Sequence, residues 1–238
     1  MDMDVYLITG ANRGIGLALA RVLVASGNIV IAGSRKPDDA FELKQLAREH
    51  PETFDLIKCD LADEQEMQSV AEESLRRRKK LDVIINNGAI MPETGGESIL
   101  EIDLNLFTKA FDTNVLGQAR VIRAFYPMLI QSEKPRIVNI SSGLGSISER
   151  EGYDYYPYSI SKAALNMLTR SVAFELGRKG ITTVAISPGW VRTDMGGQTA
   201  TLSPEQSARS LVATIEKLDP KQNGQFLSRD GKSGEYHW

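Results

Sequence analysis

Short apolar runs alternate along this chain with longer segments that mix apolar and polar residues. Short apolar runs closed by polar residues or glycine are typical of strands buried in a parallel sheet, and apolar residues at helical spacing indicate helices that cover such a sheet. Strands are predicted over residues 5–9, 29–32, 54–57, 81–85, 136–140, 181–186 and 225–227. Helices are predicted over 17–24, 41–49, 64–78, 104–130, from the segment around 158 to about 180, and 204–217.

The order of these elements is that of repeated strand–helix units, which favours parallel strands and right-handed crossovers. We therefore predict an α/β protein with a Rossmann-type doubly wound parallel sheet of about seven strands and helices on both faces. The sequence has no internal repeat, linker or low-complexity stretch. Residues 1–238 are accordingly expected to form a single domain.

The composition argues against several classes of protein. The net charge of −3 suggests neither a nucleic-acid partner nor an anionic membrane, and no apolar run approaches the roughly 20 residues of a membrane span. The basic run 76–80 is interpreted as a solvated helix end rather than a nucleic-acid patch. The two histidines stand far apart in sequence, so no metal site is assigned. The single Cys59 and the acidic start predict a cytoplasmic protein.

A glycine-rich turn lies between the first predicted strand and the first predicted helix. Glycines allow a tight turn and let the backbone approach a pyrophosphate, which the helix N-terminus attracts. No Lys followed by Ser or Thr comes after the glycines, so the turn is not a P-loop. The sequence therefore predicts a dinucleotide site that includes Gly10, Asn12, Arg13, Gly14, Ile15 and Gly16.

The end of the second predicted strand indicates which dinucleotide binds. A carboxylate there would bind the ribose 2′-hydroxyl of NAD, but the chain has Ser34-Arg35 and no acidic residue before Asp38. Arg35 and Arg13 together suit the 2′-phosphate of NADP, because each guanidinium offers bidentate hydrogen bonds. NADP is therefore the predicted cofactor. The alternative is that Arg35 is an ordinary solvated turn residue.

Tyr158 and Lys162 stand four residues apart at the start of a predicted helix, so they share one helix face. Pro157 suits the first turn of that helix. A nearby ammonium favours the phenolate, which makes Tyr158 a candidate general acid/base. By itself the pair is far more often two surface side chains on a helix, and only its context favours catalysis.

That context resembles the short-chain dehydrogenase/reductase family over nearly the whole chain. The motifs that carry the resemblance occur in the family's order: the glycine turn, Asn86-Asn87-Gly88-Ala89, Asn114, Ser141-Ser142, Tyr158-x-x-x-Lys162 and Pro188-Gly189. Residues 188–195 and 231–238 look like the C-factor and sniffer-like carbonyl reductase branch of the family. The family usually has Asn-Asn-Ala-Gly, so the exchanged Gly88-Ala89 leaves open a loop shifted by one residue.

The resemblance implies roles for four catalytic residues. Tyr158 would exchange a proton with the substrate oxygen, and Lys162 would hold the nicotinamide ribose and lower the Tyr158 pKa. Ser142, rather than Ser141, would hydrogen-bond the substrate oxygen, and Asn114 would anchor a water that passes protons to Lys162. The resemblance also implies that Asp60 and Leu61 contact the adenine and that Asn86 lines the cofactor cleft. The residues implied to contact the nicotinamide end are Pro188, Gly189, Val191 and Thr193.

Together these expectations predict an NADP-dependent oxidoreductase that interconverts a small-molecule ketone or aldehyde and its alcohol. The alternative is a regulatory or signalling protein that binds NADP and does no chemistry. Relatives often pair through the surfaces that correspond to 104–130 and to the helix that follows Tyr158, so a homo-oligomer is a further expectation. Segment 143–157 is expected to border the substrate. For Trp190, Met195 and the tail 236–238, an apolar substrate rim and ordinary packing remain alternatives.

Overall fold

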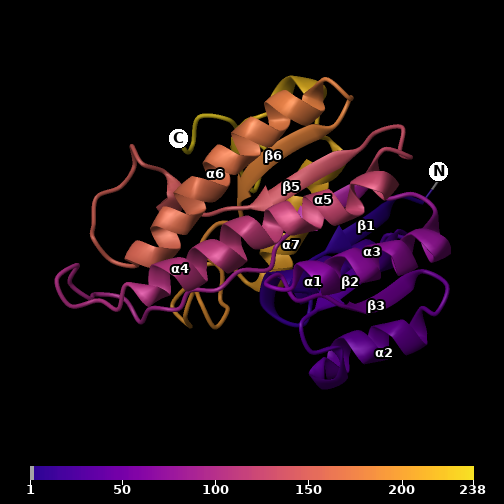
Figure 1. The fold of residues 1–238 in the computed structure, drawn as a ribbon, viewed down its shortest axis with the longest axis horizontal. Helices are drawn as coiled ribbons and strands as arrows, with labels where there is room; N and C mark the ends of the chain where they lie inside the picture. The colour runs from indigo at the N-terminus through magenta and orange to yellow at the C-terminus, as the bar shows by residue number, and fades with distance from the viewer. Residues whose placement is uncertain (1–2) are drawn as a thin grey trace.

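The computed structural model describes residues 3–238, and a parallel sheet of seven strands runs through it. The strand order is β3-β2-β1-β4-β5-β6-β7, and every neighbouring pair is parallel. This confirms the predicted Rossmann-type sheet (Figure 1). The strands are β1 (Val5–Ile8), β2 (Ile29–Ser34), β3 (Phe54–Lys58), β4 (Val83–Asn86), β5 (Arg136–Ile140), β6 (Thr182–Ser187) and β7 (Phe226–Ser228).

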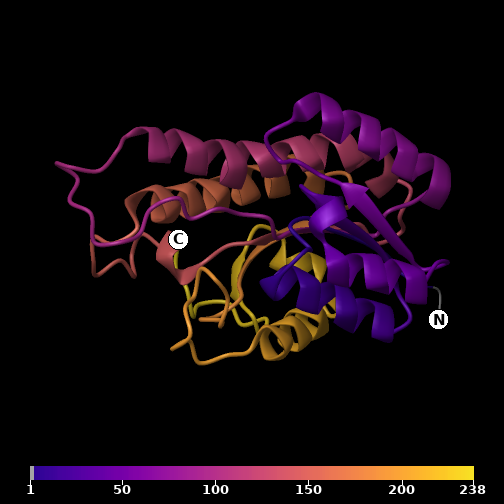
Figure 2. The same ribbon diagram turned by 90° about the horizontal axis from the view of Figure 1, so that it is seen from below.

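Helices cover both faces of the sheet, and each face has its own apolar core (Figure 2). The first layer comprises α1 (Gly14–Ala25), α2 (Phe41–Glu49) and α7 (Pro204–Glu216). The second comprises α3 (Glu64–Arg78), α4 (Asn105–Phe111), α5 (Gly117–Leu129) and α6 (Tyr156–Gly177). On the first face, Leu19 of α1 and Leu211 of α7 pack with Ile8. On the second, Phe125 of α5 packs with Leu7 in the core that α3 and α6 also join.

The helix predicted over 104–130 is interrupted, and this corrects the sequence-based expectation. A π-helical turn, Asp112–Leu116, separates α4 from α5 and holds Asn114 in its middle. The helix is wider at this turn but does not end there, because α5 follows the turn directly. The apolar pattern therefore continues across it. Turns of this kind recur at functional sites.

The carboxyl ends of all seven strands lie at one edge of the sheet, because the strands are parallel. Strands β2 and β3 lie on one side of β1, and β4 to β7 lie on the other. The reversal of strand order between the neighbours β1 and β4 leaves a crevice at that edge, where ligands bind in such folds. Two long connections, 87–104 and 141–155, extend from this end of the molecule (Figure 1). No helix within residues 3–238 has the length and apolarity to cross a membrane, and the cytoplasmic location stays a prediction.

Candidate active site

The glycine turn between β1 and α1 is folded for close backbone approach. Gly10 and Gly14 have φ angles of 63° and 54°, which favour glycine. A Cβ on Gly16 would lie 2.3 Å from the Gly10 carbonyl oxygen, so no larger residue fits. No side chain caps the N-terminus of α1, and its first turn has no acidic residue. Its N–H groups therefore suit an anion such as a pyrophosphate, in agreement with the predicted site.

Arg13 and Arg35 extend from this part of the cleft, and both are exposed. Arg35 directly follows β2, one residue beyond the buried Ser34. Arg13 forms an ion pair with Asp194, which follows β6. Thr193 lies against the glycine turn, since a Cβ on Gly14 would be 3.1 Å from its methyl group. The 188–197 segment therefore packs against the glycine turn, and the ion pair between Arg13 and Asp194 joins the two.

The connection after β4 holds the glycine turn from the other side. The Asn87 amide donates to the carbonyl oxygens of Thr9 and Gly10 at 3.0 and 3.1 Å, and the Gly88 N–H donates to the Thr9 hydroxyl at 2.9 Å. Neither Gly88 nor Ala89 has a positive φ. The exchanged Gly88-Ala89 is therefore accommodated without a strained residue. Asn86, which was expected to line the cleft, is buried in β4 and donates to the Asn139 amide oxygen at 2.8 Å.

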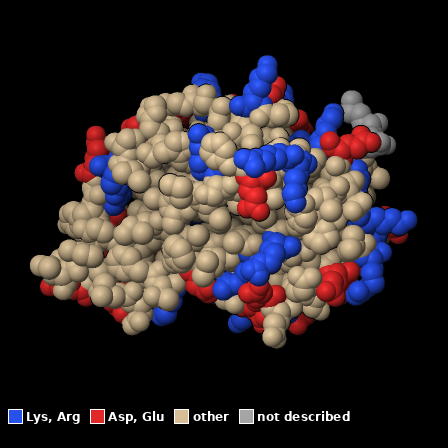
Figure 3. Space-filling view, turned by 45° about the horizontal axis from the view of Figure 1, so that its top comes forward, with Lys and Arg blue, Asp and Glu red and all other residues tan. Residues whose placement is uncertain are grey.

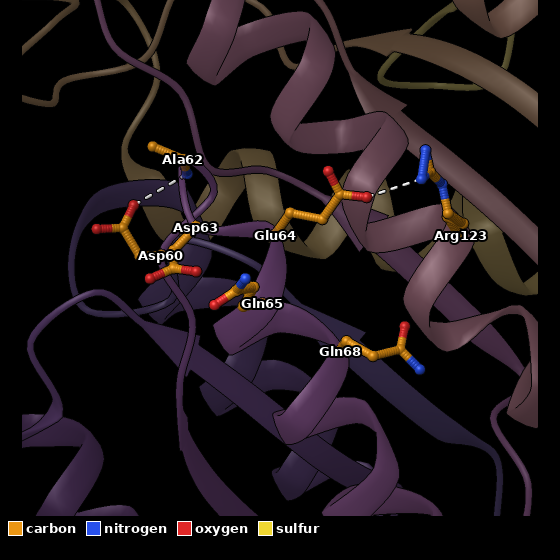
Figure 4. A pocket seen from close by; sticks show the side chains of 7 residues that line it. All are labelled: Asp60, Ala62, Asp63, Glu64, Gln65, Gln68 and Arg123. Carbon is orange, nitrogen blue, oxygen red and sulfur yellow. Dashed lines mark hydrogen bonds and ion pairs between the residues drawn. The ribbon is translucent and has the colours of Figure 1, made fainter.

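The segment expected to contact the adenine follows β3. Asp60 accepts the Ala62 N–H at 3.0 Å, and Leu61 is buried beside Gly88. Figure 4 shows Asp60 at one end of a surface depression of about 740 Å³, with the ion pair between Glu64 and Arg123 at the other. None of the catalytic candidates lines this depression. Its lining residues are Asp60, Ala62, Asp63, Glu64, Gln65, Gln68 and Arg123.

Two neighbouring serines follow β5 and have different surroundings. The Ser141 hydroxyl is buried and donates to the Asn166 amide oxygen at 2.6 Å. The Ser142 hydroxyl accepts the Leu144 N–H at 3.2 Å, remains partly exposed and interacts with the Tyr158 phenol. Ser142 is therefore the more accessible of the two serines, and its contact with a substrate oxygen stays a prediction.

Tyr158 and Lys162 lie on one face of α6, with the Lys162 ammonium nitrogen 5.5 Å from the centre of the Tyr158 ring. Burial raises the pKa of Tyr158 to about 12, the Ser142 hydroxyl opposes this rise, and the Glu93 carboxylate adds to it. Burial lowers the pKa of Lys162 to about 7. Burial is the largest cause of the raised Tyr158 pKa, and the Lys162 Nζ donates to the Ile140 carbonyl at 2.8 Å. That Lys162 lowers the Tyr158 pKa stays a prediction.

The buried Asn114 side chain connects three segments of the site. Its amide exchanges two hydrogen bonds of 2.8 Å with the backbone of Ile90, and it donates to the Ser161 hydroxyl at 2.9 Å. The Ser161 hydroxyl donates in turn to the Tyr158 carbonyl at 2.7 Å. Asn114 thus joins the connection after β4 to the first turn of α6. It does not hydrogen-bond Lys162.

The remaining predicted residues follow β6. The Pro188 carbonyl accepts the Ser207 hydroxyl at 2.8 Å, Gly189 has a φ of 80°, and Val191 is buried in a bridge to Leu202. Thr193 accepts the Gly196 N–H at 3.1 Å. These contacts fix the segment beside the glycine turn, where a cofactor bound in the crevice would meet it.

The comparisons with known proteins agree with this geometry. The family model for short chain dehydrogenases matches residues 4–202. The chain belongs to the short-chain dehydrogenase/reductase family. It is therefore an oxidoreductase of that family, as the resemblance implied.

Relatives of this short-chain dehydrogenase include the branch that the sequence indicated. The C-signal protein of Myxococcus xanthus is 38% identical over 63% of this chain and 90% of its own length. The carbonyl reductase Sniffer of D. melanogaster has a TM-score of 0.94 and 32% identity over the whole of both chains. A carbonyl reductase from chicken fatty liver, solved with NADPH bound, has a TM-score of 0.91 and 32% identity, also over the whole of both chains.

Two parts of the site in this short-chain dehydrogenase were not assigned a role from the sequence. Asn87 holds the glycine turn, and Glu93 contacts the backbone of Tyr158. The C-terminal tail, for which a substrate rim and ordinary packing were the alternatives, packs near Ser142. Tyr236 and Trp238 stack on Phe226 at 5.2 and 5.6 Å, and a Cβ on Gly143 would lie 2.8 Å from the Tyr236 ring. Asn87 belongs to the motif Asn86-Asn87-Gly88-Ala89, although no role was assigned to it. No local pattern marks Glu93, because its partner Tyr158 lies 65 positions away.

Proposed function

We propose that this short-chain dehydrogenase is an NADP-dependent carbonyl reductase that interconverts a ketone or aldehyde and its alcohol, within a single domain of residues 1–238. The observation that carries the proposal is the gathering of Ser142, Tyr158 and Lys162 where β5 ends and α6 begins, beside a glycine turn that suits a pyrophosphate. When bound, NADPH supplies a hydride to the carbonyl carbon. The protein then has to orient the carbonyl and provide one proton.

The proton in this proposal comes from the Tyr158 hydroxyl. Ser142 and Tyr158 would both hydrogen-bond the carbonyl oxygen, and the Tyr158 proton would move to that oxygen as negative charge develops on it. A phenol is a stronger acid than the alcohol that forms, so the transfer is favourable even with a pKa of about 12. That pKa also keeps Tyr158 protonated at neutral pH, which suits the direction of reduction.

Lys162 would then return a proton to the Tyr158 oxygen and hold the nicotinamide ribose. Its pKa of about 7 lets it lose and regain a proton near neutral pH. The Asn114 carboxamide is fully engaged with Ile90 and Ser161. A water that supplies Lys162 would therefore bind the backbone of Asn114, in the π-helical turn, rather than its side chain.

The choice of NADP rests on charge at the end of β2. Arg35 is exposed there, and no carboxylate precedes Asp38. Arg13 is exposed across the glycine turn, and its guanidinium has a single ion-pair partner, Asp194, among the described residues. A 2′-phosphate would meet both guanidiniums. The NADPH-bound chicken carbonyl reductase, similar over its whole length, supports the same choice.

A panel of ketones, aldehydes and alcohols assayed against both NADPH and NADH tests the proposal. The expected result is substrate-dependent consumption of NADPH that exceeds the consumption of NADH. A panel without turnover, together with tight NADPH binding and a protein partner recovered alongside, would overturn the proposal in favour of the regulatory alternative. Tight binding of NADH and weak binding of NADPH would overturn the cofactor assignment alone.

We also propose that two copies pair through α4 and α6. A large part of the surface that carries these helices has few charged side chains (Figure 3), and a groove of about 440 Å³ lies between them. Exposed apolar side chains on this face include Phe111, Leu116, Ile160, Met167 and Phe174. Contiguous apolar surface of this kind marks interaction sites, and the mass in sedimentation equilibrium would report the pairing.

A further inference from the structure

The helix that presents Tyr158 begins without a cap from its own sequence. The N-cap residue, Tyr155, has φ 59° and ψ 50°, a left-handed conformation that bulky residues rarely adopt, and its side chain caps nothing. Pro157 has no N–H to offer. The donor that an N-cap side chain would ordinarily satisfy is therefore the N–H of Tyr158 itself, the third residue of α6.

Glu93 accepts this N–H from a distant part of the chain. Its Oε1 lies 2.7 Å from the Tyr158 nitrogen, and the residue is only 5% exposed. The position suits a carboxylate, because the N-terminus of a helix stabilises negative charge. Glu93 thus replaces the missing local cap at the residue whose side chain is the candidate proton donor.

The backbone around Glu93 is fitted to the same spot. Gly95 has a φ of 91°, and a Cβ there would lie 2.6 Å from the Tyr155 ring. The 91–97 segment therefore packs directly against the residues that precede α6. The strained Tyr155 and the close approach of Gly95 both keep Glu93 in reach of Tyr158, and such strain persists only where the surroundings enforce it.

The second carboxylate oxygen of Glu93, Oε2, is buried and has no hydrogen-bond partner among residues 3–238. The Glu93 charge acts on the Tyr158 phenol, whose pKa it raises in addition to the effect of burial. The other groups that face the phenol are Lys162, from α6 itself, and the uncharged Ser142, from the end of β5.

We propose that Glu93 is a positioning residue that fixes Tyr158 at the start of α6 and holds its phenol in the protonated, proton-donating form. This inference rests on the proposed role of Tyr158 as the proton donor. It assigns to the connection after β4 a share in keeping Tyr158 protonated, which is the form that donates a proton to a carbonyl oxygen. Removing the charge while keeping the hydrogen bond separates the two parts of the role.

Glu93→Gln makes that separation, because an amide oxygen still accepts the Tyr158 N–H. The measurement is a pH titration of protein labelled with ¹³C at the tyrosine ring carbon that bears the hydroxyl, with the Tyr158 resonance assigned by its loss in Tyr158→Phe. Glu93→Gln is expected to move the titration of Tyr158 down by about one pH unit. Near pH 11 the wild-type resonance would still be mostly that of the phenol, given a pKa of about 12, whereas the variant would be about half ionised.

Glu97→Gln is the matched control, because Glu97 lies in the same connection and pairs with Thr94 instead of Tyr158. It should leave the titration unchanged. In kinetic assays, Glu93→Gln should move the pH dependence of alcohol oxidation down by the same unit, and Glu93→Ala should also lower Tm by about 2–4 °C through loss of the cap.

An unshifted Tyr158 titration in Glu93→Gln would overturn the inference, whatever the activity of the variant. A shift in Glu97→Gln as large as in Glu93→Gln would also overturn it, because the effect would then be a general one of charge on the connection. Absence of turnover by the wild-type protein would contradict the proposed function instead, and the resonance titration would still report on Glu93.

Discussion

Replacing the buried Lys162 with methionine should remove a specific pH dependence from the stability of the protein. Burial lowers the pKa of Lys162 from 10.5 to about 7, whereas the unfolded chain keeps the ordinary value. Between these values the unfolded state binds more protons than the folded state, so the free energy of unfolding rises with pH. Methionine has a similar length and no charge, so the variant lacks this contribution.

The size of the effect follows from the two pKa values. Between pH 6 and pH 9, linkage gives a gain of about 2 to 3 kcal/mol in the free energy of unfolding of the wild type relative to Lys162→Met. Ionisation of Tyr158 acts in the opposite direction, because its pKa is raised, but only above about pH 10. The pH range 6 to 9 therefore isolates the lysine.

Urea unfolding of both proteins at several pH values measures this difference directly. The control is Lys109→Met, which replaces an exposed lysine of α4 and should leave the pH dependence of the wild type unchanged. A difference between wild type and Lys162→Met that stays constant from pH 6 to 9 would refute the reasoning. Lys162 would then keep an ordinary ammonium pKa despite its burial, and its proposed return of a proton near neutral pH would lose its basis.

Two further predictions concern the cofactor cleft. Arg35→Asp should raise the Kd of NADPH by about 10- to 100-fold and that of NADH by less than about threefold, because only NADPH offers a 2′-phosphate to the guanidinium. Fluorescence titration measures both Kd values. Equal losses of affinity for the two cofactors, or a similar loss in the control Arg48→Asp, would mean that the phosphate is not recognised at Arg35. Gly10→Ala should lower the free energy of unfolding by about 1–3 kcal/mol and weaken NADPH binding, because its Cβ would lie 2.7 Å from the Gly88 Cα. Gly27→Ala, which also has a positive φ but nothing within 4 Å of its Cβ, should cost less and leave binding intact; identical effects would discount the contact with Gly88.

The sequence alone predicted the fold well because local signals and tertiary structure agree in the sheet and in most helices. The predicted strand over 136–140 and the predicted helix over 64–78 have the bounds of β5 and α3. For α3, the Asp63 side chain accepts the Glu66 N–H at the start, and arginines follow at the end, so both boundaries carry local signals. The π-helical turn at Asn114 was missed because the apolar spacing of one widened turn does not differ visibly from that of a helix.

The site was predictable where it depends on motifs and not where it depends on distant contacts. Spacing indicated that Tyr158 and Lys162 share a face. Of the two neighbouring serines, the one expected to bind the substrate oxygen is the one that remains partly exposed. The net rise of the Tyr158 pKa could not be predicted, because it depends on burial, which the spacing of two residues does not report. Likewise, the ion pair of Arg13 with Asp194 joins residues 181 positions apart, and no local pattern could indicate it.

The central claim is that Tyr158 supplies the proton to a carbonyl reduced at the expense of NADPH. The most direct measurement is kcat/KM for NADPH-dependent reduction of a carbonyl that the wild type accepts, in the wild type and in Tyr158→Phe, with the Kd of NADPH determined for both. The account predicts a loss of about 10²- to 10⁴-fold in kcat/KM with the Kd changed by less than about threefold. Unchanged kcat/KM in Tyr158→Phe would contradict it.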